Sequence, residues 1–327
     1  MAADGGPKAV VAALLANSGI AVLKFLAFVL TQSSSMLAES IHSVADAGNQ
    51  GLLLLGGKRA KREATPEHPF GYGRERYIYA FIVAIVLFSV GGLFALYEAY
   101  HKYHEVHAGE PNELLDGGFA WVAIAVLVGA IVMESFSFRT AIVESNKVRG
   151  KASWTKFVRN AKSPELPVIL LEDLAALLGL VFALVGVSLS LLTGNGYWDV
   201  AGTTAIGILL VCVAVLLALE TKSLLLGESA SLEAQHRIRT VLGSIDKIDR
   251  VIHMKTLHLG PEELLVAVKV GVAEDASAAQ VAEAIGVAER AIRQAEPVAQ
   301  HIYIEPDIYQ AQHVPDERPV PPAPAAH

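Results

Sequence analysis

Residues 36–57, MLAESIHSVADAGNQGLLLLGG, form an apolar run that is interrupted by a few ionisable side chains. A run of about 20 mostly apolar residues is long enough to cross a bilayer as a helix. His42 and Asp46 lie one helical turn apart, so they share a face. Glu39 and Asn49 extend this face by one turn in each direction. Because charged groups at bilayer depth are costly and usually functional, the run predicts a membrane helix with an active polar face.

A second apolar run, VILLEDLAALLGL at residues 168–180, contains the adjacent acids Glu172 and Asp173. Adjacent helical residues point about 100° apart, so we expect only one of these two acids to bind an ion directly. Histidine and aspartate are zinc ligands, and a tetrahedral site needs four ligands in all. The alternative is a hydrogen-bonded polar seam between helices. A histidine and two carboxylates would be an expensive seam, which favours the ion site.

Composition assigns the chain to the membrane class, because 53% of its 327 residues are hydrophobic and only 18% are charged. The first apolar run lacks a signal-peptide cleavage site, so we expect it to be retained. The single cysteine, Cys212, excludes an internal disulfide and a zinc site built from several thiolates. Six stretches are apolar enough to predict transmembrane helices: Val10–Leu30, Met36–Gly56, Ile78–Leu96, Phe119–Phe138, Val168–Leu192 and Val200–Leu219.

Basic residues predict the orientation of these spans, because cytoplasmic connections are enriched in lysine and arginine. The connections on the opposite side of the predicted membrane contain only Lys102 as a cation. With six spans, both termini are then expected in the cytoplasm. The basic connections contain Lys58, Arg59, Lys61, Arg62, Arg74 and Arg76 after the second span, and Arg139, Lys147, Arg149, Lys151, Lys156, Arg159 and Lys162 after the fourth.

The chain becomes polar after Leu226. Its pattern there predicts, in order, a helix at 231–245, strands at 250–260 and 263–272, a helix at 277–295 and a strand at 301–306. We therefore expect a membrane domain over residues 1–226, a small cytoplasmic α+β domain of αββαβ order over 227–310, and a disordered Pro/Ala-rich tail over 311–327. Acids outnumber bases in this part, so nucleic-acid binding is not expected.

The strings SSSMLAESIHSVADAGNQ (33–50) and EHPFGYGRER (67–76) resemble the cation diffusion facilitator family of divalent-metal transporters. WTKFVRNAKSPELPVILLEDLAALLGL (154–180) is most similar to the branch that includes mitochondrial zinc transporters. The resemblance implies six transmembrane helices, a ferredoxin-like cytoplasmic domain, a homodimer in the lipid bilayer, and exchange of Zn2+ for protons. Carried over residue by residue, it implies that His42, Asp46 and Asp173 bind the metal.

The chain departs from this family at Ile169, where most zinc-transporting relatives have histidine. Glu172 is the obvious substitute for the fourth ligand, while Asn49, Glu39 or water are the alternatives. A site with one nitrogen and several carboxylate oxygens is harder than a site with two histidines. Zinc remains the leading prediction, and Mn2+, Fe2+ or Co2+ become plausible cargoes.

A ligand must release its proton before it binds metal, so metal and protons compete for the same groups. His42 is the natural proton exchanger. The sequence thus predicts Zn2+/H+ antiport out of the cytoplasm and no enzymatic activity. The alternatives are a Mn2+, Fe2+ or Co2+ exporter of the same fold, a membrane metal sensor, a passive cation channel, and a metalloenzyme with metal-activated water, for which no substrate motif is recognisable.

The HPFGYGR string also offers His68, at a place where relatives hold a second metal. We favour a tight turn instead, because glycine and proline set the backbone of such a loop. The resemblance further suggests that Arg74 anchors the soluble domain, with Glu228 as its partner. The short N-terminal segment without a presequence favours a bacterial inner membrane.

Overall fold

The computed structural model describes residues 7–110, 112–116 and 120–310. These residues form two compact units. The first contains the described residues up to Arg59 together with Arg76–Lys222, and the second contains Ala60–Glu75 together with the described residues from Ser223. The predicted tail at 311–327 lies outside the described residues.

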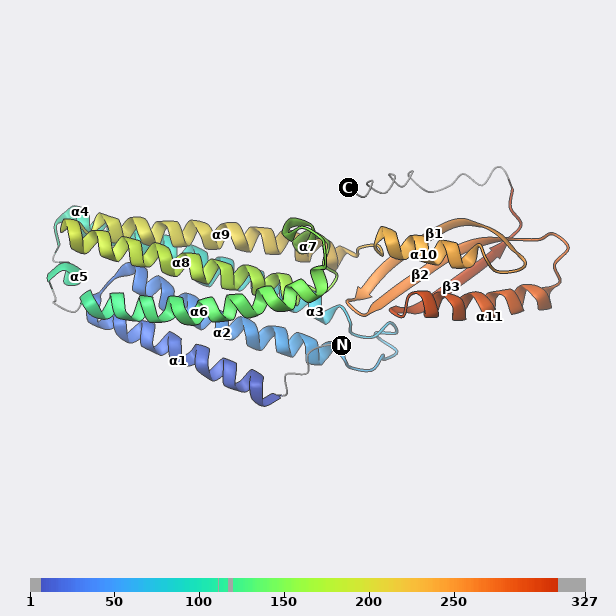
Figure 1. The fold of residues 1–327 in the computed structure, drawn as a ribbon, viewed down its shortest axis with the longest axis horizontal. Coiled ribbons are helices and arrows are strands. Elements are labelled where there is room, and N and C mark those ends of the chain that lie inside the picture. The colour runs from blue at the N-terminus through green and yellow to red at the C-terminus, as the bar shows by residue number, and fades with distance from the viewer. Residues whose placement is uncertain (1–6, 111, 117–119, 311–327) are drawn as a thin grey trace. The chain divides into compact units, whose positions relative to one another are not determined.

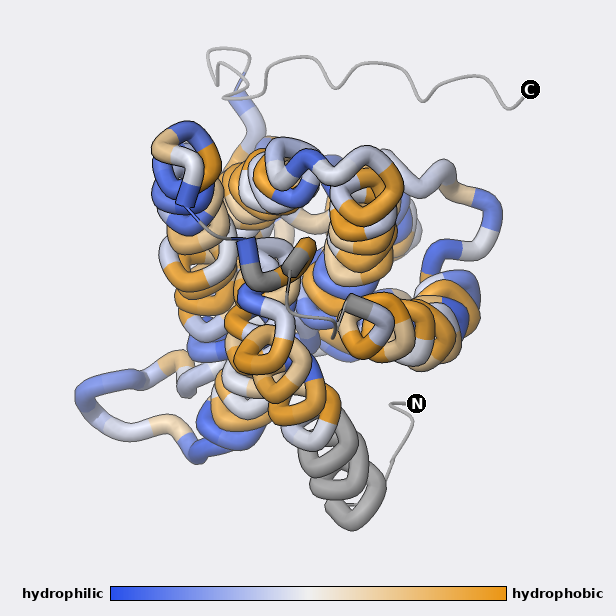
Figure 2. Tube along the Cα trace, turned by 90° about the vertical axis from the view of Figure 1, so that its left-hand side faces the viewer, coloured by the Kyte–Doolittle hydropathy of each residue, from blue (hydrophilic) through white to orange (hydrophobic). Residues whose placement is uncertain are grey.

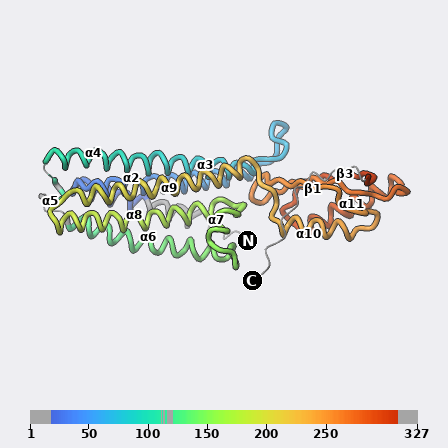
Figure 3. The backbone as a smooth tube through the Cα atoms, turned by 90° about the horizontal axis from the view of Figure 1, so that it is seen from above, coloured from blue at the N-terminus to red at the C-terminus, as the bar shows by residue number. Residues whose placement is uncertain are grey.

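Long helices that run alongside one another make up the first unit (Figures 1 and 3). A π-helical segment joins two of these helices into one continuous rod. The elements are α1 (Pro7–Thr31), α2 (Ser34–Ala60), α3 (Glu75–Val86), η1 (Leu87–Leu93), α4 (Phe94–Ala108), α5 (Glu113–Asp116), α6 (Ala120–Arg149), α7 (Trp154–Asn160), α8 (Glu165–Thr193) and α9 (Tyr197–Leu226).

Four helical segments of the described chain are long and apolar enough to cross a membrane: Glu75–Ala108, Trp121–Arg149, Glu165–Thr193 and Tyr197–Leu226. They coincide with the last four predicted spans. Helix α2 has 27 residues but is less apolar, because it carries the polar face that includes His42. Hydrophobic residues predominate along the helices in Figure 2, and hydrophilic residues gather in the connections.

The α1–α2 connection is tied to the start of α9 by a buried carboxylate. Asp199 accepts hydrogen bonds from the Ser34 amide (2.9 Å) and the Ser33 hydroxyl (2.9 Å), and so caps the first turn of α2. Gln32 has φ of 50°, which lets the chain reverse direction in this short connection. Helices α8 and α9 also approach closely, because a Cβ at Gly202 would lie 2.9 Å from the Phe182 carbonyl. These contacts fix one end of α2 within the bundle.

The second unit contains α10 (Leu232–Leu242), β1 (Ile248–Gly260), β2 (Glu263–Val272), α11 (Ala278–Ala295) and β3 (Ala299–Asp307), which is the predicted αββαβ order. Strand β2 is central, antiparallel to β1 and parallel to β3. Alternate β2 residues such as Val266 and Val268 pack with Ile238 of α10 and Ile292 of α11 in one core. The two helices therefore cover the same face of the sheet (Figure 3).

The loop at Ala60–Glu75 belongs to this second unit, whereas the sequence placed it in the membrane domain. A Cβ at Gly260 would lie 2.9 Å from the Gly73 Cα, so the two backbones touch without side chains between them. The Phe70 ring also meets the His301 ring edge to face, with centroids 5.2 Å apart. This contact joins residues far apart in the chain, which local sequence patterns do not reveal.

Candidate metal site

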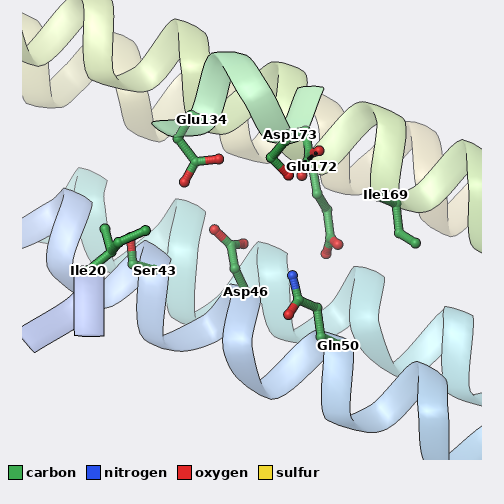
Figure 4. Close-up of a pocket in the computed structure, with 9 residues that line it drawn as sticks. Ile20, Ser43, Asp46, Gln50, Glu134, Ile169, Glu172 and Asp173 are labelled. Atoms are coloured by element: carbon green, nitrogen blue, oxygen red, sulfur yellow. Dashed lines mark hydrogen bonds between the residues drawn. The ribbon is translucent and has the colours of Figure 1, made fainter. Parts of the chain in front are cut away.

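Four acidic side chains from three helices line one small cavity in the first unit (Figure 4). They are Asp46 of α2, Glu134 of α6, and Glu172 and Asp173 of α8. The cavity has a volume of about 20 Å³. A space of this size holds about one water molecule, and hence one small ion. The remaining lining residues are Ile20, Ser43, Gln50, Ser137 and Ile169.

His42 lies beside this cavity rather than in its lining. Its Nε2 atom is 3.5 Å from the Asp46 Oδ2 atom, as the helical spacing predicts. Neither ring nitrogen of this buried imidazole has a hydrogen-bond partner among the described residues, and the same holds for Asp46 Oδ1. Buried polar atoms normally have partners, so these atoms are available to bind a cation or a proton.

Glu172 and Asp173 both line the cavity, although we expected only one of them to point inward. Glu172 accepts a 2.7 Å hydrogen bond from the Asn49 amide on α2. Asp173 accepts a 2.9 Å hydrogen bond from the Ser137 hydroxyl on α6. The cavity lies between α2 and α6, so two adjacent residues of α8 reach it from either side. The 100° step between them matches this arrangement.

Ile169 also lines the cavity, one helical turn before Asp173. Its hydrocarbon side chain forms part of the wall and supplies no ligand. The position at which relatives offer histidine therefore faces the candidate site in this chain. The donor set of the cavity is dominated by oxygen.

Sequence reasoning did not assign Glu134, which the structure places opposite Asp46 (Figure 4). A usable signal was present, because Glu134 is an isolated acid within an apolar span. The second missed feature is η1, in which a Cβ at Gly91 would lie 3.8 Å from His42 Nδ1. Single π-helical turns recur at functional sites. No sequence pattern marks η1 in advance.

The candidate ligands are close neighbours but do not form a finished coordination shell. Within residues 7–110, 112–116 and 120–310, no group of three or more His, Cys, Asp or Glu side chains is arranged to hold a metal ion. The carboxylates of Glu172 and Asp173 are instead engaged by Asn49 and Ser137. Side-chain rotation is therefore needed before they converge on one ion.

The other candidates named from the sequence lie elsewhere. Glu39 pairs with Lys24, whose Nζ atom is 3.1 Å from Glu39 Oε2, and it does not line the cavity. His68 lies in the second unit, in a turn closed by reciprocal backbone hydrogen bonds with Thr65. Its ring packs edge to face on Tyr72, with centroids 4.7 Å apart. Gly71, with φ of 78°, completes this turn.

Arg74 lies beside Gly227, the residue that precedes Glu228. A Cβ at Gly227 would be 3.9 Å from Arg74 Nη2. The Arg74 Nε atom is buried and has no hydrogen-bond partner among the described residues. An ion pair between Arg74 and Glu228 stays a prediction.

Comparison with known proteins covers most of the chain. The model of the cation efflux transmembrane domain matches residues 10–226. The mouse mitochondrial proton-coupled zinc antiporter SLC30A9 is 34% identical over 259 residues, which are 78% of this chain and 44% of the mouse protein. Metal tolerance protein C4 of Arabidopsis thaliana is 28% identical over 78% of this chain and 54% of its own. The magnetosome protein MamM of Paramagnetospirillum magneticum is 24% identical over 41% of this chain and 40% of its own.

This chain thus spans about half the length, or less, of these relatives. The mouse SLC30A9 protein is named as mitochondrial, so it gives no support to the expected bacterial inner membrane. The apolar helices and the matched domain make the protein a multi-pass membrane protein. With the family model covering residues 10–226, the chain belongs to the cation efflux, or cation diffusion facilitator, family.

Proposed function

We propose that this protein exports divalent metal cations in exchange for protons, with Zn2+ as the leading cargo. The observation that carries the proposal is the cavity in which Asp46, Glu172 and Asp173 face one another, with His42 adjacent to it. Several acids at one point within membrane helices are costly unless they bind a cation. The zinc antiporter activity named for SLC30A9 supports the same cargo.

In this proposal His42, Asp46 and Asp173 bind the metal, and Glu172 is the fourth ligand. Glu172 is suited to the role because its carboxylate already lines the cavity that Ile169 leaves without an imidazole. Glu172 must then release Asn49, and Asp173 must release Ser137. Glu39 is not a ligand in this proposal, and Asn49 acts through Glu172. Three carboxylates and one imidazole make an oxygen-rich set that also admits Mn2+, Fe2+ and Co2+.

Proton exchange follows from the same groups. Each carboxylate and the imidazole binds metal only when it is deprotonated, so metal entry displaces protons and protonation expels metal. The unpartnered ring nitrogens of His42 are free to take part in this competition. A proton gradient can then drive metal transport against its own gradient when the site alternates between the two sides of the membrane.

For the whole chain we propose six spans with both termini in the cytoplasm, α1 and α2 being the first two. We also propose a homodimer formed through the second unit. The sheet face opposite α10 and α11 carries Leu265 and Ala267, which are partly exposed, and Tyr303, which is 56% exposed. A partly apolar sheet face without a helix over it suits contact with a second copy.

The test is metal uptake into sealed proteoliposomes that contain a fluorescent zinc indicator, with and without an imposed pH gradient. We expect concentrative uptake that requires the gradient, and its loss in Asp46→Ala and Asp173→Ala. Glu144→Gln is the matched control, because Glu144 is an exposed acid that pairs with Lys147 on α6. Uptake that is independent of the gradient would indicate a channel, and metal binding without flux would indicate a sensor.

A further inference from the structure

Lys24 of α1 is a fully buried cation that the proposed transport cycle does not use. Its Nζ atom lies 3.1 Å from Glu39 Oε2 and 2.8 Å from Ser43 Oγ. The side chains of Lys24 and Glu39 are both 0% exposed. Removing two opposite charges from solvent is expensive, and breaking such a pair on one side leaves an uncompensated buried charge. The pair therefore calls for a functional explanation.

The pair lies directly beside the candidate metal site. Ser43, which binds the Lys24 ammonium, also lines the cavity with Asp46. Ile20, one turn before Lys24 on α1, lines it too. Lys24 is close enough to His42 and Asp46 to act on both electrostatically. A charge at this position must change the energy of a divalent cation in the cavity.

Glu39 is held away from the cavity although it shares the polar face of α2. Its Oε2 atom binds Lys24, and its Oε1 atom has no hydrogen-bond partner among the described residues. That carboxylate lies against Gly179 of α8, where a Cβ would be only 2.6 Å from Oε1. The glycine leaves room for the carboxylate, and Lys24 keeps it there.

We propose that Lys24 and Glu39 form a charge-neutral pair that sets the affinity and the metal preference of the transport site without binding the metal. Lys24 retains the Glu39 carboxylate, so this acid adds neither a ligand nor a net charge to the site. Without Lys24, the freed carboxylate strengthens binding and favours harder cations. Without the carboxylate, the bare ammonium repels the cation. The inference rests on the proposed metal site.

The two single substitutions therefore have opposite effects, which is the basis of the test. The full-length protein in detergent or nanodiscs is titrated calorimetrically with Zn2+ and with Mn2+, and Kd is measured for each metal. Lys24→Met should tighten Zn2+ binding by about tenfold and tighten Mn2+ binding by more, while Glu39→Gln should weaken both by about tenfold. The double variant should return to within about threefold of wild type.

The control is an exposed ion pair of the same chemistry, Lys147 and Glu144 on α6, whose charged atoms are 2.5 Å apart. Lys147→Met and Glu144→Gln should leave both Kd values unchanged. A purely structural pair would weaken binding, or lower the yield, in the same direction for both single variants. That result, or unchanged Kd values, would overturn the proposal.

If Lys24→Met does not fold, Glu39→Gln and the double variant still decide, because Lys24→Met must then reverse the loss caused by Glu39→Gln. Flux separates this inference from the proposed function. Wild-type protein that binds metal without transporting it refutes export but leaves the Kd comparison intact. Wild-type protein that binds neither metal refutes both.

Discussion

The Asn49 amide in α2 donates a 2.7 Å hydrogen bond to the Glu172 carboxylate in α8, across the helix interface that contains the candidate metal site. The neighbouring Asp173 is tied to α6 through Ser137. Two adjacent acids thus join α8 to two different helices. A cation that takes both carboxylates must replace both hydrogen bonds. Metal binding is thereby linked to the packing of the three helices, which is what an alternating transporter requires.

Ile169→His should restore the imidazole that relatives carry one turn before Asp173. Because Ile169 lines the cavity, the new nitrogen ligand faces the metal directly. We expect the ratio of Zn2+ to Mn2+ affinity to rise by about tenfold, because imidazole suits zinc better than manganese. The measurement is calorimetric titration with both metals. Ile169→Gln, which is polar but has no imidazole, is the control, and an equal gain in that variant would contradict the prediction.

Glu134→Gln should weaken metal binding although no sequence motif includes this residue. Glu134 lines the same cavity as Asp46, so its negative charge attracts a bound cation even without direct coordination. We expect an increase in Kd of about tenfold with the fold intact. Glu144→Gln on the same helix serves as the exposed control. Equal affinities for the two variants would remove Glu134 from the site.

Asp199→Ala should destabilise the membrane unit. Asp199 is 1% exposed and accepts hydrogen bonds from Ser33 and Ser34, so its loss leaves buried donors without partners. The expected cost is about 1–3 kcal/mol, seen as a lower thermal midpoint of the detergent-solubilised protein. Thr204→Ala is the control, because the Thr204 hydroxyl bonds only to Val200 of its own helix. A midpoint no lower than that of the control would contradict the capping role.

Glu263→Gln should stabilise the second unit at neutral pH. Burial is the main cause that raises the pKa of Glu263 above its usual 4.5, with Glu262 adding to it and His301 opposing it. An acid whose pKa is raised by folding retains its proton better in the folded state. Stability is therefore lost as the pH rises above about 4.5. The amide removes this loss, by less than about 1 kcal/mol because Glu263 is partly exposed.

Hydrogen exchange of β1 and β2 peptides in the full chain measures this effect. Protection in Glu263→Gln should exceed that of wild type at pH 7 and match it near pH 4. Glu274→Gln, in an exposed turn after β2, is the control. A difference between Glu263→Gln and wild type that is constant across the pH range would show that ionisation of Glu263 is not the cause.

Local patterns in the sequence were enough for much of the fold. Continuous apolar runs predicted α6, α8 and α9, and alternating apolar residues predicted β1 and β2, because these periods follow from backbone geometry alone. The pairing of His42 with Asp46 followed equally from the helical repeat. The four clearest spans were predictable, whereas the polar face of α2 obscures its membrane character.

The sequence by itself thus determined the helices, the strands and the family, together with the acids and the histidine that make a cation site plausible. Only the tertiary structure decided which of these groups meet. It brought Glu134 to the cavity, turned both Glu172 and Asp173 toward it, and diverted Glu39 to Lys24. The physical reason is that helix rotation and side-chain pairing depend on packing between residues distant in the chain, which no local period encodes.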